Sequence, residues 1–274
     1  MLIGMKSAIV LDKCFLQGSK KARIHELAQA HRLVVSDALF YELLTSSEPG
    51  RSRCFAKFPP IDNPVDLVDH IGTLMRIEIE THSASGKPSA HRETLRFQFN
   101  PRLVNPDYQL PENARLLVEE QAEQLRSDVM SFVQRASTIN SFFPNLLVGS
   151  HAQRVKAREA AELAIAEPSS LISFYALLEP PPGQKPLPAP ELVSENWALY
   201  RWLQVKFLFA LDLYVRYQGK IPEEFSPSIF EKLEHDVLDA QVLMLGCLEG
   251  AFATREKKLK HWWRILCPTG TLYE

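Results

Sequence analysis

Short apolar runs alternate with helical segments at the two ends of the chain. Residues 6–12, 32–36, 251–254 and 264–267 each contain such a run, with the length and composition of a buried strand. Segments whose apolar residues recur at helical spacing lie between these runs. Alternation of this kind predicts strands of a single parallel sheet, joined by right-handed crossovers and covered by helices on both faces.

The middle of the chain follows a different pattern. Residues 74–80 and 94–99 alternate apolar and polar positions and are separated by a turn-forming segment, so we expect a β-hairpin or two paired strands. Residues 179–190 are rich in proline, which indicates a stiff connector. Apolar residues at helical spacing predict helices over residues 112–136, 151–166, 169–178 and 191–218.

This change of pattern predicts the domain organisation. We expect residues 1–45 and 190–274 to form one α/β domain, because the short apolar runs that alternate with helical segments occur only there. Residues 46–189 are then an insertion made of a hairpin and helices, which ends in the proline-rich connector 179–190.

Composition and charge narrow the class of protein. The 274 residues are 46% hydrophobic, which supports a full core, and the formal charge of −2 provides no overall basic field. The four cysteines form no C-x-x-C pair and are typical of free thiols in a reducing compartment. The first ten residues lack the features of a signal peptide, and the apolar stretch at 207–215 is interrupted by charge. We therefore expect a cytoplasmic protein that does not associate with a membrane.

Acidic residues stand at positions that a parallel sheet brings to one edge. Asp12 ends the first predicted strand, Glu42 lies in the helix after the second, and Glu256 follows the third. Asp236 and Asp239 lie three residues apart on one face of the helix before that third strand. Clustered carboxylates repel one another, so such a site needs cations, and oxygen ligands suit Mg²⁺ or Mn²⁺. These ions activate water and neutralise charge on a phosphodiester.

The acids stand in four short segments, in chain order: Val10-Leu11-Asp12, Val35 to Leu44, Asp236 to Ala240, and Thr254-Arg255-Glu256. Together these segments resemble the four signature blocks of PIN-domain nucleases. The resemblance implies a three-layer α/β/α fold with a central parallel sheet. It also implies cleavage of single-stranded RNA or other nucleic acid with Mg²⁺ or Mn²⁺. Many members of that family are ribonuclease toxins of bacterial toxin–antitoxin pairs, so a protein partner or inhibitor, or a homo-oligomer, is a further expectation.

The resemblance assigns a role to each acid. Asp12 matches the first acid of the family and Glu42 the second. Asp239 matches the third, and Asp236 can share its role as a metal ligand. Glu256 stands where the family usually has an aspartate, which lengthens that ligand by one methylene group.

Basic residues near these segments are candidates for contact with the phosphate backbone of a nucleic acid, although solvated surface charge is an alternative for each of them. They are Lys13, Lys20, Arg51, Arg53 and Arg255.

Two other functions fit the same residues. A PIN-like fold that serves as a binding or regulatory scaffold, with a degenerate site, is favoured by Glu256 and by Lys13 beside Asp12. A phosphatase-type hydrolase with Asp12 as nucleophile is also possible in principle. Its weakness is that the residue two positions later is Cys14, where a second acid would be expected.

Overall fold

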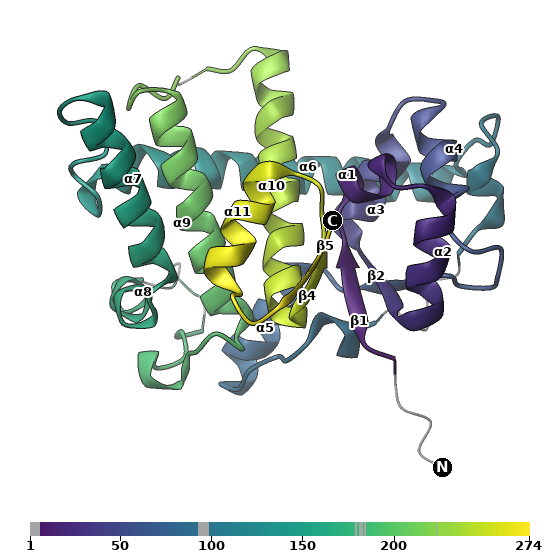
Figure 1. Cartoon of the computed structure of the whole chain (residues 1–274), viewed down its shortest axis with the longest axis horizontal. Helices are drawn as coiled ribbons and strands as arrows, with labels where there is room; N and C mark the ends of the chain where they lie inside the picture. Colours follow the sequence, from purple (N-terminus) through teal and green to yellow (C-terminus); the bar gives the residue numbers. More distant parts are fainter. Residues whose placement is uncertain (1–5, 93–98, 179, 181–182, 184, 223) are drawn as a thin grey trace. The chain divides into compact units, whose positions relative to one another are not determined.

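A computed structural model shows an α/β protein with a five-stranded sheet in which all strands run parallel. The strand order is β3-β2-β1-β4-β5 (Figure 1). The structure describes residues 6–92, 99–178, 180, 183, 185–222 and 224–274.

The sheet joins the two ends of the chain, as the sequence predicts. Its central strand β1 (Ala8–Leu11) is buried at every position, because β2 (Arg32–Ser36) and β4 (Ala251–Ala253) flank it. The outer strands are β3 (Asp66–Val68) and β5 (Thr271–Tyr273). Strands β1 and β4 are neighbours in the sheet and run parallel, so the residues that follow them meet at the same edge of the sheet.

The last predicted strand is wrong. Most of residues 264–267 lies in helix α11 (Lys257–Leu266), and the final strand of the sheet is β5. The buried residues of α11 are Leu259, Trp262, Trp263 and Leu266, which recur at helical spacing. The apolar run at 265–267 is the end of this helical stripe, and Trp263 packs against Phe252 of β4 with ring centroids 5.4 Å apart.

The predicted strand at residues 74–80 is also wrong, because this segment belongs to helix α5 (Ile71–Thr81). Ile71, Leu74 and Glu78 are its fully buried positions and share one helical face. Glu78 stands between Ile77 and Ile79, so the sequence alternates polar and apolar residues as an exposed strand does, although Glu78 is buried. Of the predicted partner strand at 94–99, only Phe99 lies within the described residues.

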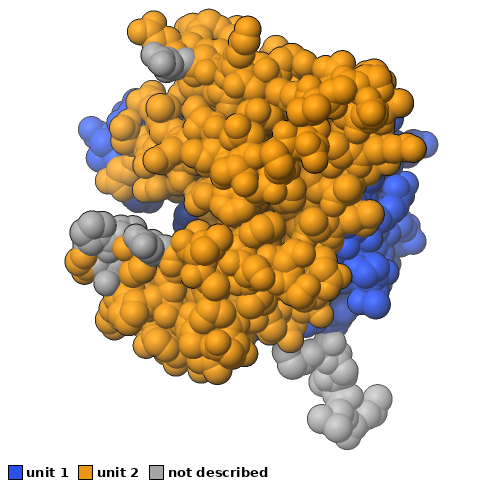
Figure 2. All heavy atoms as spheres, turned by 90° about the vertical axis from the view of Figure 1, so that its left-hand side faces the viewer, with its two compact units in different colours: residues 1–74, 86–119, 245–274 blue, residues 75–85, 120–244 orange. Residues whose placement is uncertain are grey.

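The chain forms two compact units, coloured separately in Figure 2. The first contains residues 1–74, 86–119 and 245–274 and therefore holds the whole sheet. The second contains residues 75–85 and 120–244. These bounds differ from the predicted ones, since much of the segment 46–189 belongs with the sheet and residues 190–244 belong with the helical unit.

Helices α2 and α3 of the first unit lie against strand β2 of the sheet (Figure 1). The Ser36 side chain accepts a hydrogen bond from the Leu39 amide at 3.0 Å and so caps α3. The helices at this end of the chain are α1 (Lys13–Gly18), α2 (Lys21–Ala30), α3 (Asp37–Thr45) and α4 (Gly50–Phe55).

The second unit is helical. Helices are confirmed in the predicted segments 112–136, 151–166 and 169–178. The helix predicted at 191–218 begins later, at Ala198. No helix of the described residues is long and apolar enough to cross a membrane. The helices of this part of the chain, after α5, are α6 (Glu112–Thr138), α7 (His151–Ala166), α8 (Pro168–Tyr175), α9 (Ala198–Arg216) and α10 (Pro227–Glu249).

The start of α9 is set by Glu78. Its carboxylate is fully buried and accepts hydrogen bonds from the amides of Ala198 at 2.6 Å and Leu199 at 2.8 Å. It also accepts from the amide and the hydroxyl of Ser85, at 3.0 and 2.9 Å. A carboxylate at a helix N-terminus satisfies unpaired amides and interacts favourably with the helix dipole.

We predict that Glu78→Ala lowers the free energy of unfolding by about 2–4 kcal/mol, because it leaves buried amides without an acceptor. Urea denaturation followed by circular dichroism measures the change. The control is Glu80→Ala, which removes an exposed glutamate from the same helix and should change stability little. Equal stability of the two variants would show that Glu78 does not hold the start of α9.

Candidate functional site

Asp12 follows β1 directly and lies at the carboxyl edge of the sheet. Its amide donates to the carbonyl of Ala253 in β4 at 3.0 Å, so the backbone pairing of β1 and β4 continues to this residue. Its side chain is buried, with the residue only 4% exposed. Carboxylate Oδ2 accepts hydrogen bonds from Thr254 Oγ1 and from Cys14 Sγ, both at 2.6 Å.

Burial raises the pKa of Asp12 above its usual value. The hydrogen bonds from Cys14 and Thr254 oppose this increase, and the negative charge of Glu42 adds to it. The ionised carboxylate is therefore less stable in the folded protein than in water. A carboxylate in this condition is typical of functional sites, although structural networks produce it too.

Cys14 and Thr254 connect the ends of β1 and β4. Burial and the nearby charge of Asp12 raise the pKa of Cys14 to about 12, so the sulfur keeps its proton and acts as a donor. Cys14 Sγ lies 3.4 Å from Thr254 Oγ1 and accepts from the Arg255 amide at 3.2 Å. These contacts fix the orientation of the Asp12 carboxylate.

Glu42 comes to the same edge from helix α3, which follows the neighbouring strand β2. Its carboxylate is 3.1 Å from the ammonium group of Lys13, and both side chains are largely buried, at 14% and 18% exposure. Its charge affects the pKa of Asp12, so the first two acids named by the sequence interact in the folded protein. Lys13 partly compensates this pair of negative charges.

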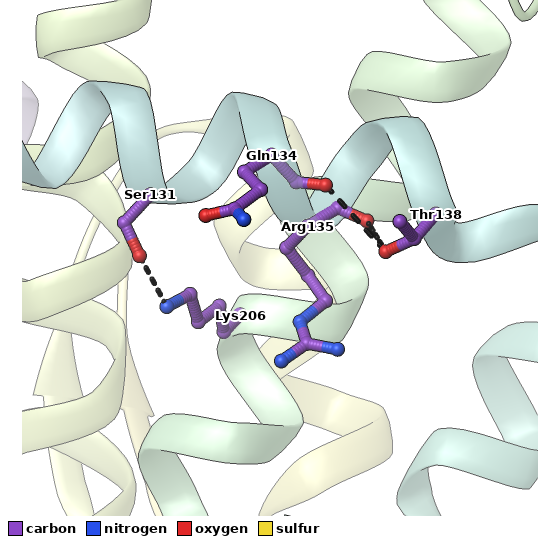
Figure 3. Close-up of a pocket in the computed structure, with 5 residues that line it drawn as sticks. All are labelled: Ser131, Gln134, Arg135, Thr138 and Lys206. Atoms are coloured by element: carbon purple, nitrogen blue, oxygen red, sulfur yellow. Dashed lines mark hydrogen bonds between the residues drawn. The ribbon is translucent and has the colours of Figure 1, made fainter. Parts of the chain in front are cut away.

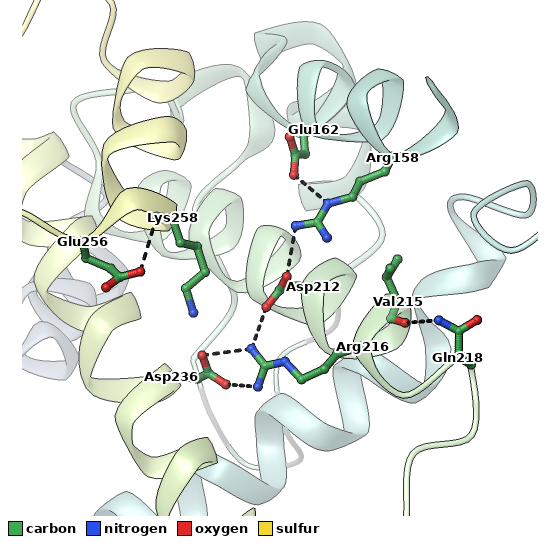
Figure 4. Close-up of polar contacts among 9 residues, drawn as sticks. All are labelled: Arg158, Glu162, Asp212, Val215, Arg216, Gln218, Asp236, Glu256 and Lys258. Atoms are coloured by element: carbon green, nitrogen blue, oxygen red, sulfur yellow. Dashed lines mark hydrogen bonds and ion pairs between the residues drawn. The ribbon is translucent and has the colours of Figure 1, made fainter. Parts of the chain in front are cut away.

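Glu256 lies just beyond β4, two residues after Thr254. Its amide donates to Thr254 Oγ1 at 3.1 Å. Its side chain is the N-cap of α11 and accepts from the Lys258 amide at 3.5 Å (Figure 4). Glu256 thus lies next to Thr254, which contacts Asp12, and its side chain caps α11.

Asp236 and Asp239 lie on helix α10, in the part of the chain that belongs to the second unit. Arg216 donates to both oxygens of Asp236, at 2.7 and 3.3 Å. Figure 4 shows that this pair continues through Asp212 to Arg158, with contacts of 2.6 and 3.0 Å. A bidentate arginine compensates the charge of Asp236, so a structural role accounts for this aspartate.

The described residues contain no group of three or more histidine, cysteine, aspartate or glutamate side chains arranged to hold a metal ion. The structure relates Asp12, Glu42 and Glu256 to one edge of the first unit. Asp239 remains a predicted ligand, assigned by its position in the sequence.

The sequence prediction missed Asp69 and His70 because it missed strand β3, and it gave no role to Asp37, which begins α3. Register pairs Ser36 of β2 with Val68 of β3, so Asp37 and Asp69 follow at neighbouring positions. Burial raises the pKa of Asp37, and the charge of His70 lowers it. Asp37 Oδ1 and His70 Nε2 are buried and have no hydrogen-bond partner among the described residues. The available signal was the short apolar run Leu67-Val68 that ends in an acid and a histidine.

The basic residues proposed to contact nucleic acid fall into two groups. Lys13 pairs with Glu42, Arg51 pairs with Glu48 at 2.6 Å, and Arg255 donates to the carbonyl of Gly18. These three side chains have structural partners in the protein. Lys20 and Arg53 are exposed and remain candidates for such a contact.

Comparisons with known proteins add no assignment, since no protein-family model, no curated protein and no solved structure matches this chain. The interpretation of the site therefore depends on its own geometry.

We predict that Thr254→Val lowers stability by about 1–3 kcal/mol at neutral pH, because the ionised Asp12 loses a buried donor. The loss of this donor raises the pKa of Asp12 further. The destabilisation should therefore shrink as pH falls and Asp12 takes up a proton in both proteins. Urea denaturation at a series of pH values measures this dependence.

Thr254→Ser is the matched control, because it keeps the hydroxyl group and should keep most of the stability. A Thr254→Val variant whose deficit is the same at every pH would show that the hydroxyl does not interact with the charge of Asp12.

Proposed function

We propose that this chain is a PIN-like ribonuclease that depends on Mg²⁺ or Mn²⁺, with its site at the carboxyl end of β1. The main support is the buried carboxylate of Asp12, which interacts with Glu42 from the helix after the adjacent strand. The carboxyl edge of a parallel sheet is the usual location of a site in α/β proteins. The all-parallel sheet is compatible with the three-layer α/β/α fold of that family, which we also propose.

The chemistry of these residues suits a hard divalent cation. Asp12 and Glu42 supply carboxylate oxygens, the ligand type that Mg²⁺ prefers. Burial makes the ionised form of Asp12 unfavourable, and a cation would compensate that charge. Lys13, which now holds Glu42, would have to release it when a cation binds.

Each residue has a defined part in this proposal. Asp12 and Glu42 would hold the cation, with Glu256 as a further ligand. Thr254 and Cys14 keep Asp12 in its orientation through hydrogen bonds to Oδ2. A bound Mg²⁺ or Mn²⁺ supplies water activation and neutralises charge on a phosphodiester. Single-stranded RNA is the proposed substrate.

A specific observation favours the second candidate, a scaffold without catalytic activity. Lys13 already compensates Glu42, and Arg216 already compensates Asp236. With these pairs in place, neither Glu42 nor Asp236 needs a metal to compensate its charge. The two candidates therefore differ in whether the acids respond to a divalent cation.

We predict that Asp12→Asn reduces cleavage of single-stranded RNA by at least about a hundredfold, since loss of even the outer partners of metal ligands costs about 10–100-fold. The variant should melt at a higher temperature than wild type at pH 7 in EDTA. Burial raises the pKa of Asp12, so ionised Asp12 destabilises the fold above that pKa. This advantage should shrink as pH falls toward 3.8.

The measurements are cleavage of a labelled RNA panel and thermal melts in EDTA and in Mn²⁺. Asp62→Asn, which changes an exposed aspartate of the same unit, is the control. Mn²⁺ should stabilise wild type and the control and leave Asp12→Asn unchanged. A wild type that neither cleaves RNA nor gains stability from Mn²⁺ would exclude the nuclease and favour the scaffold.

We further predict that Lys13→Met increases the affinity for Mn²⁺, because it removes a cation that competes for Glu42. The shift of melting temperature with Mn²⁺ concentration measures this affinity. Lys20→Met, at an exposed lysine nearby in the sequence, is the control. An affinity equal to that of wild type would mean that Glu42 is not a metal ligand.

A further inference from the structure

A small polar pocket lies in the second unit, between helices α6 and α9 (Figure 3). Its volume is about 260 Å³, slightly below the range of about 300–1,000 Å³ that is usual for sites of drug-sized ligands. The pocket is lined by Ser131, Gln134, Arg135, Thr138 and Lys206. Two of these side chains are cationic and none is acidic.

Lys206 is held in a partly buried position on α9. Its ammonium group donates to Ser131 Oγ at 2.7 Å and lies 5.8 Å from the centre of the Phe132 ring. Burial lowers the pKa of Lys206, the charge of Arg135 lowers it further, and Asp128 opposes the change. Asp128 is itself engaged by the side-chain amides of Gln124 and Gln241, at 3.1 Å each. Because the charge of Arg135 lowers the pKa of Lys206, the two cations of the pocket repel one another.

Arg135 contributes the second positive charge from α6. Its guanidinium carbon lies 5.6 Å from the centre of the Phe207 ring, which supports one face of the group. Within the described residues, neither Arg135 nor Lys206 has a carboxylate oxygen within 4.0 Å.

Three other arginines of the second unit are arranged differently. Arg158, Arg201 and Arg216 each form an ion pair with a carboxylate, at 3.0, 3.3 and 2.7 Å. Two neighbouring cations without such a partner, on a concave surface with hydroxyl and amide groups, form a site that an anion would stabilise.

We propose that this pocket binds the phosphate group of a phosphorylated ligand. Arg135 supplies the planar fork that pairs with two phosphate oxygens, and Lys206 supplies a point charge. The Ser131 hydroxyl accepts from Lys206 and keeps its own proton to donate, and the Gln134 side chain offers an amide donor. Thr138 lines the pocket only, because its hydroxyl is bonded to the carbonyls of Gln134 and Arg135. This proposal is independent of the nuclease function.

The test is a titration of the full chain with inorganic phosphate at constant ionic strength, followed by isothermal calorimetry and thermal melts. Arg135→Gln should weaken phosphate binding about tenfold or more, as the loss of a charge-assisted hydrogen bond does. Lys206→Met should have a similar effect. Arg126→Gln is the matched control, because Arg126 lies on the same helix, is exposed and pairs with Glu123. Melts without phosphate establish that each variant is folded.

Phosphate binding that is lost in Arg135→Gln and kept in Arg126→Gln supports the proposal. A nucleoside 5′-monophosphate and an oligoribonucleotide without a terminal phosphate then distinguish a phosphomonoester from a backbone phosphodiester as the source of the group. Equal affinity of wild type and Arg135→Gln for inorganic phosphate would overturn the proposal. Stabilisation that chloride reproduces at the same ionic strength would overturn it as well.

Discussion

The Asp12 carboxyl group lies where water is largely excluded, and its hydrogen bonds connect the two ends of the chain within the first unit. The residue follows a strand that is buried at every position, so its side chain is buried too. Two side-chain donors reach it, and one of them, Thr254, lies 242 residues away in the sequence. The parallel pairing of β1 with β4 brings that donor into place. Stability and the candidate site therefore depend on the same contact between the two ends of the chain.

Two other buried acids show what a purely structural carboxylate looks like in this protein. Glu78 accepts amides at the start of α9, and Glu249 accepts the amide and the hydroxyl of Ser89, both at 3.0 Å. Backbone amides satisfy these carboxylates and make them part of the fold. Asp12 also has a backbone hydrogen bond, with Lys13, and differs because Glu42 adds a second negative charge nearby. This difference distinguishes Asp12 as a functional candidate.

The strands β1, β2 and β4 were predictable because a central parallel strand is buried on both faces and reads as a continuous apolar run. Strand β3 was not predicted, because only Val68 of its three residues is buried. Asp69 and His70, which follow β3, were therefore not recognised as residues of the same sheet edge. Helix α5 was misread because Glu78 is polar and yet buried. The pairing of Asp236 with Arg216 joins residues 20 positions apart on two helices, which no local pattern encodes. Local apolar patterns thus predicted the centre of the sheet, and long-range polar contacts determined the rest.

If a divalent cation compensates the charge of the buried Asp12 carboxylate, the titration of this group responds to Mg²⁺. The most direct measurement is an NMR titration of the Asp12 carboxyl carbon with and without Mg²⁺. We expect a pKa of Asp12 above 3.8 in the metal-free protein and a lower apparent pKa once Mg²⁺ is added. An elevated pKa that Mg²⁺ does not change would contradict the metal site and leave Asp12 as a structural acid.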